Sequence, residues 1–386
     1  MKKYFKRNNL GFVLFSGAIF FTFLGISSFL EVPNLEYLAV PAGQSPLGGA
    51  ENKEIKNFHI ATPSPVKGIY MSSWVAGTKD WREKLVNLID STELNSIVID
   101  VKDYTGRISF EVADPGLQEI GSSEERISDI KEFLEELHSK NIYAIARIAV
   151  FQDPFLTKKR PDLAVKRGDK TTTWKDYKGI SWLDPCSIEV WDYAVKIGKE
   201  AERVGFDELN FDYIRFPSDG NMKDISFSHC PVQFTKSEII KDFFSYLNQQ
   251  LKGTKIPLSA DVFGMVTTNT DDLNIGQVLE KIEPYFDYIS PMVYPSHYPP
   301  TYDGYKNPAL YPYEIISHAM ASSSERLIAA SSTPLKLRPW LQDFDMGATY
   351  DASMIRKEKQ AVYDSGLSSW LLWDPSNKYT PGALDQ

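Results

Sequence analysis

The sequence has few cysteines and histidines and no excess of positive charge, and each shortage excludes a class of function. Its 386 residues include two cysteines and five scattered histidines, with no CxxC pair and no HExxH motif. No metal site or cofactor is therefore predicted. The net charge of −9 argues against nucleic acid as a partner, because phosphate binding needs a basic surface. Cys186 and Cys230 are compatible with one disulfide bond outside the cytoplasm or with two free thiols.

Long apolar runs are also scarce, and the one that is present lies at the N-terminus. Basic residues at positions 2, 3, 6 and 7 precede an uncharged run over residues 10–30. A helix that spans a bilayer needs about 20 apolar residues, so residues 1–30 are predicted to form a transmembrane anchor. The basic flank would stay in the cytoplasm and place the rest of the chain outside it. A cleaved signal peptide is the alternative, and it would give a secreted protein.

The next two segments differ in composition. Residues 31–66 contain repeated prolines and glycines and predict a flexible tether. From Lys67 to the end, at residue 386, short apolar segments alternate with helical patterns, which predicts one folded domain with a parallel sheet. The strand-like segments are 67–72, 96–103, 143–151, 208–214, 257–264, 288–294, 326–332 and 368–374.

Eight such units favour a (β/α)8 TIM barrel. A doubly wound open sheet is the alternative, but no glycine-rich phosphate loop follows the first segment. About a dozen residues follow the eighth strand, fewer than a barrel helix and its connection usually occupy. The last outer helix is therefore predicted to be short or missing.

Polar residues interrupt the fourth strand, in the stretch GFDELNFDYIRFP at 205–217. Side chains alternate across a strand, so Glu208, Asn210 and Asp212 share one face. That face is predicted to point into the barrel, with Asp212 nearest the mouth. Asp261 on the fifth strand has the matching parity, so the two aspartates should approach each other. An ion pair between Asp212 and Arg147 or Arg215 is the purely structural alternative.

Two carboxylates at a barrel mouth are what hydrolysis of a glycosidic bond requires. Asp212 and Asp261 are therefore the predicted catalytic pair. Aromatic rings near the strand ends are interpreted as sugar-stacking surfaces, with loop packing as the alternative. The predicted substrate contacts are Trp74, Asp100, Lys102, Arg147, Asn210, Arg215, Tyr294 and Trp373.

Several motifs resemble a bacterial family of TIM-barrel domains assigned to glycoside hydrolysis. The matching segments include KGIYMSSWVAG, SIVIDVKDYTG, YAIARIAVFQDP, SADVFGM and LLWDPSNKY, in the expected order between residues 67 and 379. The resemblance implies a barrel fold and a carbohydrate substrate. A more distant likeness is to family 18 chitinases, whose fourth strand ends in DxxDxDxE. Asp207, Asn210 and Asp212 match its three aspartates, while Ile214 replaces the catalytic glutamate.

The leading hypothesis is therefore a membrane-anchored, extracytoplasmic glycoside hydrolase. Its substrate would be a polysaccharide of the cell envelope or the extracellular space. The missing glutamate at Ile214 supports an alternative hypothesis, a glycan-binding protein on a barrel that does not catalyse hydrolysis.

Overall fold

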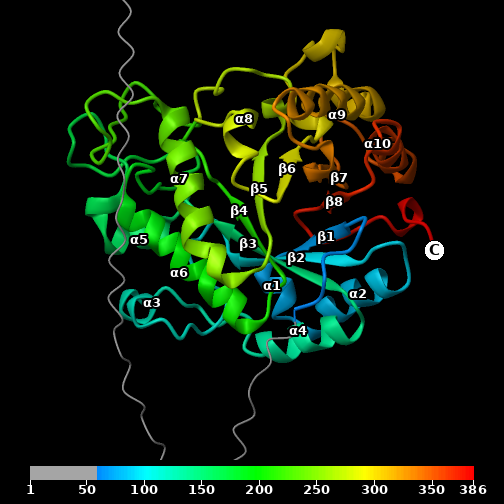
Figure 1. The fold of residues 1–386 in the computed structure, drawn as a ribbon, viewed down its shortest axis with the longest axis horizontal. Helices are drawn as coiled ribbons and strands as arrows, with labels where there is room; N and C mark the ends of the chain where they lie inside the picture. The colour runs from blue at the N-terminus through cyan, green and yellow to red at the C-terminus, as the bar shows by residue number, and fades with distance from the viewer. Residues whose placement is uncertain (1–58) are drawn as a thin grey trace, which may run out of the picture. The chain divides into compact units, whose positions relative to one another are not determined.

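The structure is a computed structural model, and residues 59–386 are described (Figure 1). The predicted anchor over residues 1–30 and the first part of the predicted tether, residues 31–58, lie outside the described residues. Within the described part of the chain, none of the helices combines the length and the apolar character that crossing a membrane requires.

The strands form a closed barrel in which all neighbours are parallel and follow chain order from β1 to β8, and β8 pairs with β1. This confirms the predicted TIM barrel. The strands are β1 Lys67–Met71, β2 Ser96–Lys102, β3 Tyr143–Ala149, β4 Glu208–Asp212, β5 Leu258–Phe263, β6 Tyr288–Met292, β7 Trp340–Gln342 and β8 Trp370–Trp373.

Helices surround the barrel, as Figure 1 shows. The α-helices are α1 Ser73–Ala76, α2 Lys79–Asp90, α3 Pro115–Ile120, α4 Ile130–Ser139, α5 Pro154–Lys159, α6 Ile188–Val204, α7 Lys236–Leu251, α8 Leu279–Ile282, α9 Pro312–Ala329 and α10 Ala352–Asp364. The longer ones bury one apolar face against the sheet, the usual arrangement of an amphipathic helix. Helix α6 ends at Val204, and its C-cap residue is Gly205. The φ of Gly205, 116°, lies in the left-handed region that glycine adopts without strain.

The eighth strand has no helix after it. The chain continues only into a 3-10 turn, Pro381–Ala383. Arg356 of α10 fixes this turn by donating from Nη2 to the backbone carbonyl of Gly382 at 2.8 Å. The prediction of a short or missing last helix is confirmed.

The seventh strand was placed wrongly by the sequence pattern. Residues 326–332, RLIAASS, were predicted to form it, but residues 326–329 are the last turn of α9. Arg326 holds this turn by donating from Nη1 to the carbonyl of Val266 and from Nη2 to Glu280. The actual strand is three residues long and begins directly after Pro339. A strand this short has too little alternation for the sequence to reveal it.

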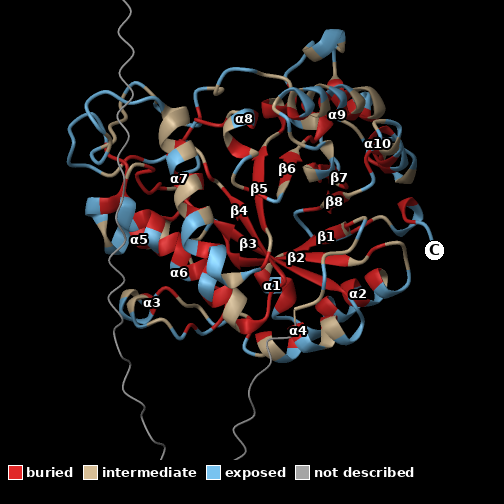
Figure 2. Cartoon of the chain, viewed as in Figure 1, coloured by how far each residue is buried: buried red, intermediate tan, exposed pale blue. Residues whose placement is uncertain are grey.

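The packing has two apolar layers. One fills the space between strands and helices, and Figure 2 shows the strands and the inner sides of the helices as buried. The other lies inside the barrel and consists of Val66, Tyr70, Val98, Tyr143, Ile145, Tyr294, Trp340 and Leu371. The polar residues that point inward are therefore exceptions within an apolar interior.

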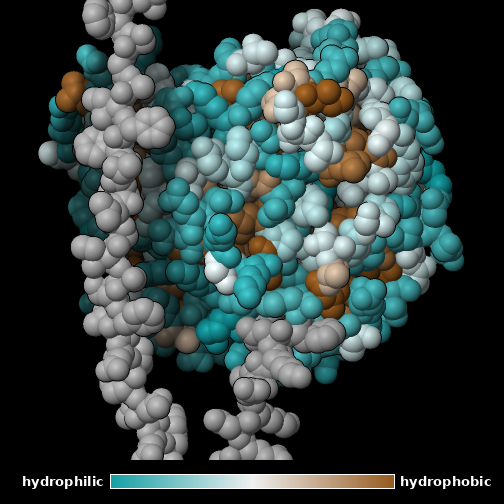
Figure 3. Space-filling view, in the orientation of Figure 1, coloured by the Kyte–Doolittle hydropathy of each residue, from teal (hydrophilic) through white to brown (hydrophobic). Residues whose placement is uncertain are grey.

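On the face shown in Figure 3, hydrophilic residues predominate and hydrophobic ones lie in separate small groups.

Residues 59–66 lie against the N-terminal end of the barrel, although residues 31–66 were predicted to be a tether. The backbone N–H of Ile60 donates to Asp207 at 2.8 Å, and Thr62 shares a hydrogen bond with the Tyr143 hydroxyl at 3.0 Å. Val66 is fully buried. This part of the segment therefore belongs to the barrel body.

Candidate active site

A cavity of about 250 Å³ opens at the C-terminal end of the barrel strands. This is the end at which TIM-barrel enzymes carry their active sites. Six of the residues predicted for the site line it, namely Arg147, Asp212, Arg215, Asp261, Tyr294 and Trp373. Arg147, Asp212 and Asp261 thus point inward, as the alternation of side chains on β3, β4 and β5 predicted.

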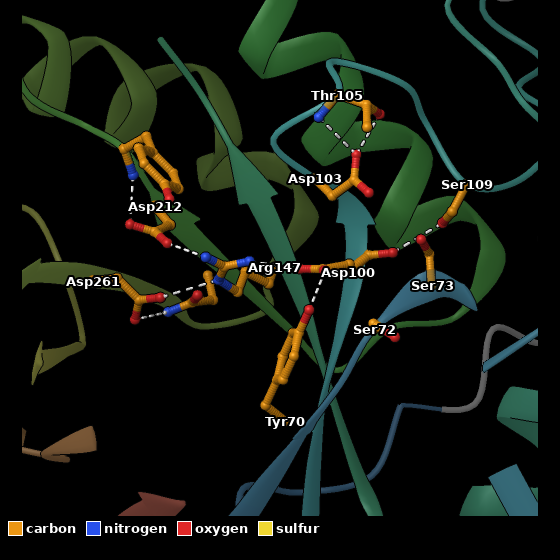
Figure 4. A network of polar contacts seen from close by, with 12 residues as sticks. Tyr70, Ser72, Ser73, Asp100, Asp103, Thr105, Ser109, Arg147, Asp212 and Asp261 are labelled. Carbon is orange, nitrogen blue, oxygen red and sulfur yellow. Dashed lines mark hydrogen bonds and ion pairs between the residues drawn. The ribbon is translucent and has the colours of Figure 1, made fainter. Parts of the chain in front are cut away.

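Arg147 of β3 is the centre of the polar network at the base of the cavity (Figure 4). Its Nη1 donates to Asp100 of β2 at 2.6 Å, its Nη2 donates to Asp212 of β4, and its Nε lies 3.6 Å from Asp261 of β5. All four side chains are at least nine-tenths buried. One guanidinium therefore faces three carboxylates from three different strands, and their nearby charges raise the pKa of Arg147 even though burial opposes this.

Asp261 is held differently from Asp212. Its Oδ1 accepts hydrogen bonds from the Trp340 indole at 2.8 Å and from the Asn210 amide at 2.9 Å. Burial, followed by the nearby charge of Asp212, raises the pKa of Asp261 to about 7. Asp261 can therefore carry a proton near neutral pH, which is the requirement for a general acid.

Asp212 ends β4, and the backbone turns sharply after it. Its Oδ1 accepts from the backbone N–H of Tyr213, while its Oδ2 accepts from Arg147. Tyr213 has φ of 52°, in the left-handed region that non-glycine residues rarely occupy. Such strain is concentrated at functional sites, where surrounding structure holds the residue in place. The turn fixes the carboxylate of Asp212 at the base of the cavity.

Asp100 lies below the cavity rather than on its wall. It accepts from the Tyr70 hydroxyl at 2.6 Å in addition to Arg147. Burial raises the pKa of Asp100, against the opposing effect of the Arg147 charge. Asp100 therefore positions the guanidinium, and its predicted direct contact with substrate is not provided by this geometry. Asn210 similarly acts from below, through Ser259 and Asp261.

Aromatic rings form much of the cavity wall. Trp373 stacks on Tyr70 with ring centroids 3.9 Å apart, and the Arg147 guanidinium lies 5.0 Å from the Trp373 ring. Trp340 meets Trp373 edge-on, at an interplanar angle of 88°. Tyr294 of the loop after β6 completes this side. Flat apolar rings around a polar base suit a sugar, which has apolar faces and a polar rim.

Lys102 was predicted to contact substrate, and the structure contradicts this. Its Nζ lies 3.0 Å from Asp153 and donates to the carbonyl of Ala149 at 2.6 Å, on the side of the sheet that faces α6. The reason is a bulge in β2, where Asp100 pairs with Arg147 but Lys102 pairs with the next residue, Ile148. The extra residue reverses the alternation, so Asp100 points inward and Lys102 outward.

Trp74 lies on α1, outside the cavity wall. Its side chain is 56% exposed, and the Arg126 guanidinium lies 4.3 Å from its ring. Arg126 is in turn paired with Asp103 at 2.7 Å. The predicted contact of Trp74 with substrate therefore needs a glycan that extends beyond the cavity, and it stays a prediction.

The predicted site omits two residues that shape it. Trp340 lies outside the segment predicted as the seventh strand, yet it belongs to β7 and donates to Asp261. Tyr70 of β1 supports both Asp100 and Trp373. Tyr70 could have been found from the alternation in KGIYMS, since it shares the inward parity of Gly68. Trp340 could not, because its strand was not recognised.

Cys186 and Cys230 form a disulfide bond, which joins the start of α6 to the long loop between β4 and α7. Within residues 59–386, the grouping with metal-ligand spacing is these two cysteines with Asp184. The disulfide consumes both thiols, and Asp184 accepts backbone N–H bonds from Cys186 and His229. The cluster thus acts as a structural brace.

The family model described as "Putative glycosyl hydrolase domain" matches residues 68–379. This range includes every barrel strand apart from the first residue of β1 and contains the whole cavity. The chain belongs to this family. The resemblance that the sequence motifs indicated is therefore confirmed. No curated protein matches the sequence.

Solved structures of related folds are also similar to this chain. The PgaB (BpsB) glycoside hydrolase domain from Bordetella bronchiseptica matches with 11% identity and a TM-score of 0.59, over 81% of this chain and 94% of that one. At this identity, the likeness shows the fold. A hypothetical protein from Ruminiclostridium thermocellum ATCC 27405 is 38% identical, with a TM-score of 0.46, over 50% of this chain and 97% of that one. A class V chitinase from Pseudomonas fluorescens Pf-5 matches with 11% identity and a TM-score of 0.49, over 83% and 97%.

Proposed function

We propose that this protein is an extracytoplasmic glycoside hydrolase that cleaves a cell-envelope or extracellular polysaccharide. The observation that carries the proposal is the placement of Asp212 and Asp261 on either side of one guanidinium, at the base of an aromatic cavity. A purely structural ion pair needs one acid for one arginine. The additional carboxylates and the open cavity above them supply what glycosidic bond cleavage needs.

The two aspartates take different roles because their surroundings differ. Asp261 is the general acid, since its raised pKa leaves a proton available near neutral pH. Its Oδ1 already accepts two hydrogen bonds, so Oδ2 carries the proton and gives it to the glycosidic oxygen. Asp212 acts as a carboxylate whose charge Arg147 stabilises. It attacks the anomeric carbon, or it takes a proton from the water that does so.

Location outside the cytoplasm rests on two features. The disulfide between Cys186 and Cys230 is typical of proteins in oxidising compartments. The uncharged run over residues 10–30 behind a basic end is typical of an anchor or a signal peptide. We propose attachment through this segment, or secretion where it is removed.

Sugar release from envelope and extracellular polysaccharides tests the function, together with binding of the same polysaccharides. We expect Asp212→Asn to lose activity by about 10⁴-fold, as loss of a nucleophile or its base does, while its circular dichroism and unfolding curve remain those of a folded barrel. Full activity of this variant would remove the mechanism.

The alternative, a glycan-binding protein without activity, is favoured by Ile214. This buried residue occupies the position at which family 18 chitinases, in the likeness above, carry their catalytic glutamate. Binding of a polysaccharide by the wild-type protein, with no release of sugar from any polysaccharide tested, would establish this alternative.

A further inference from the structure

The cavity contains a second guanidinium, and it lacks a carboxylate partner. Arg215 follows β4 by three residues and lines the same cavity as Asp212. Its Nη1 donates to the backbone carbonyl of Phe216 at 3.1 Å and to the Ser218 hydroxyl at 3.2 Å. Within residues 59–386, no carboxylate forms an ion pair with it. Among the described residues, its Nε and Nη2 have no hydrogen-bond acceptor, since both of its hydrogen bonds come from Nη1.

Packing holds this guanidinium in one place. It lies 4.9 Å from the centre of the Trp182 ring, and Trp182 is buried. The Trp182 indole donates to Asp176 at 3.1 Å, which fixes the ring. The other oxygen of Asp176 accepts from the backbone N–H groups of Lys178 and Ile180. Asp176 thus accepts its hydrogen bonds from within its own loop and forms no ion pair with Arg215, although its charge acts on the guanidinium from a distance.

Burial acts to lower the pKa of both arginines of the cavity, but their net shifts are opposite. Burial lowers the pKa of Arg215, and the acids around it only partly compensate. For Arg147, the carboxylates outweigh burial and raise the pKa. A half-buried cation without a partner costs free energy, so such a group is usually paired or serves a ligand. Arg215 lines the cavity that a substrate would occupy.

Positive charge also reaches the cavity from the loop between β3 and α6. Lys178 is exposed on this loop and has no ion-pair partner in the described part of the chain. Its charge acts on His297, whose pKa is lowered first by burial and then by Lys178. His297 is part of the cavity wall. Lys178 therefore adds positive charge close to His297 in the cavity wall.

We propose that the cavity selects a glycan whose sugar carries an anionic group beside the cleaved bond, and that Arg215 binds this group. The inference rests on the proposed function, because it names the substrate class of the same site. A guanidinium edge with two free N–H directions matches the two oxygens of a carboxylate, such as that of a hexuronic acid. Sulfate and phosphate esters of sugars offer the same oxyanion chemistry, and the experiment separates them.

The experiment measures binding of oligosaccharides by titration calorimetry, with the full chain. The probes are oligosaccharides of galacturonic and glucuronic acid, their carboxyl-reduced counterparts, and sulfated and phosphorylated oligosaccharides. Carboxyl reduction keeps the sugar backbone and removes only the charge. We expect the wild-type protein to bind one class of anionic probe at least about tenfold more tightly than its neutral counterpart, as hydrogen bonds to charged groups do.

Two variants locate the effect. Arg215→Gln should abolish the preference, so that the anionic probe binds no more tightly than its neutral counterpart. Arg167→Gln is the matched control, because Arg167 is an exposed arginine of the loop between β3 and α6 that pairs with Asp224 outside the cavity. It removes the same charge and should keep the preference. Whichever anionic class loses affinity in Arg215→Gln identifies the bound group.

Equal binding of anionic and neutral probes, no binding of any anionic probe, or an unchanged preference in Arg215→Gln would overturn the inference. The hydrolase proposal would survive these results if Asp212→Asn still abolished sugar release. Conversely, anion binding that depends on Arg215, without sugar release from any polysaccharide, would keep Arg215 as the binding residue for the anionic group and remove the hydrolase.

Discussion

The two ends of the barrel interior each contain a buried arginine, and the comparison between them distinguishes structure from function. At the N-terminal end, Arg338 donates to Glu208 at 2.8 Å, and the Tyr143 hydroxyl donates to the same carboxylate at 3.0 Å. The Tyr288 ring centre lies 3.1 Å from the Arg338 guanidinium. One cation meets one acid, and aromatic rings enclose the pair.

At the C-terminal end, one cation meets three acids. Arg147 contacts Asp100, Asp212 and Asp261, and a cavity opens above them. The excess of negative charge contributes to the raised pKa of Asp261. An enclosed ion pair leaves no room for a substrate. The cluster at the C-terminal end has a cavity above it and an acid that can carry a proton near neutral pH, so these two differences mark the functional end.

The two ends are compared by replacing one acid at each, and the largest expected effect is that of replacing Asp261. Asp261→Asn should lower kcat by about 10²–10⁴-fold, the range for loss of a general acid. Glu208→Gln makes the same acid-to-amide change at the N-terminal end of the barrel interior. It should leave the kcat of the folded protein unchanged. Steady-state kinetics on the polysaccharide that the wild-type protein cleaves provide the measurement. Comparable losses in both variants would show that the two ends do not differ in role.

Replacing Arg338, the cation of the N-terminal ion pair, should lower stability. Arg338→Met leaves Glu208 buried and unpaired, so the free energy of unfolding should fall by about 3–5 kcal/mol. Denaturant unfolding measures this, and kcat below the unfolding transition should be unchanged. The double variant with Glu208→Gln should recover part of the loss, because no unpaired charge remains. A loss of activity without a loss of stability would contradict a structural role for the ion pair of Arg338 and Glu208.

Asp261 should also make both kcat/KM and the free energy of unfolding depend on pH. Above pH 7, Asp261 loses the proton that it donates, so kcat/KM should fall about tenfold for each further pH unit. Since its folded-state pKa lies above the ordinary value of 3.8, the folded protein holds a proton that the unfolded chain has released. The free energy of unfolding should therefore decrease as pH rises from about 4 through about 7. Asp261→Asn should flatten this decrease in a pH series of unfolding curves.

The smallest expected effect concerns the aromatic wall. Trp373→Ala should raise KM by about tenfold or less, which is the scale of one ring contact. Trp81→Ala is the control, because Trp81 is 47% exposed on α2 and is not part of the cavity wall. Its KM should equal that of the wild-type protein. An unchanged KM in Trp373→Ala would assign that ring to packing against Tyr70 alone.

Prediction from sequence succeeded where one regular strand positioned the residue. On β4 and β5, the alternation alone placed Asp212 and Asp261 on the inward face, and on β3 it placed Arg147 beside them. It failed where the ladder is irregular or short. The bulge in β2 turned Lys102 outward, and the three-residue β7 concealed Trp340, which donates to Asp261.

The sequence by itself determined the number of strands, the positions of β1 to β6 and of β8, the inward faces of β3 to β5, and the family. These depend on local periodicity and on short motifs, which neighbouring residues carry. Only the tertiary structure decided that Arg147 faces three acids, that Arg215 forms an ion pair with none of the described acids, and that the cysteines are joined. These facts depend on barrel closure and strand register, which bring together residues from distant parts of the chain and which no local pattern encodes.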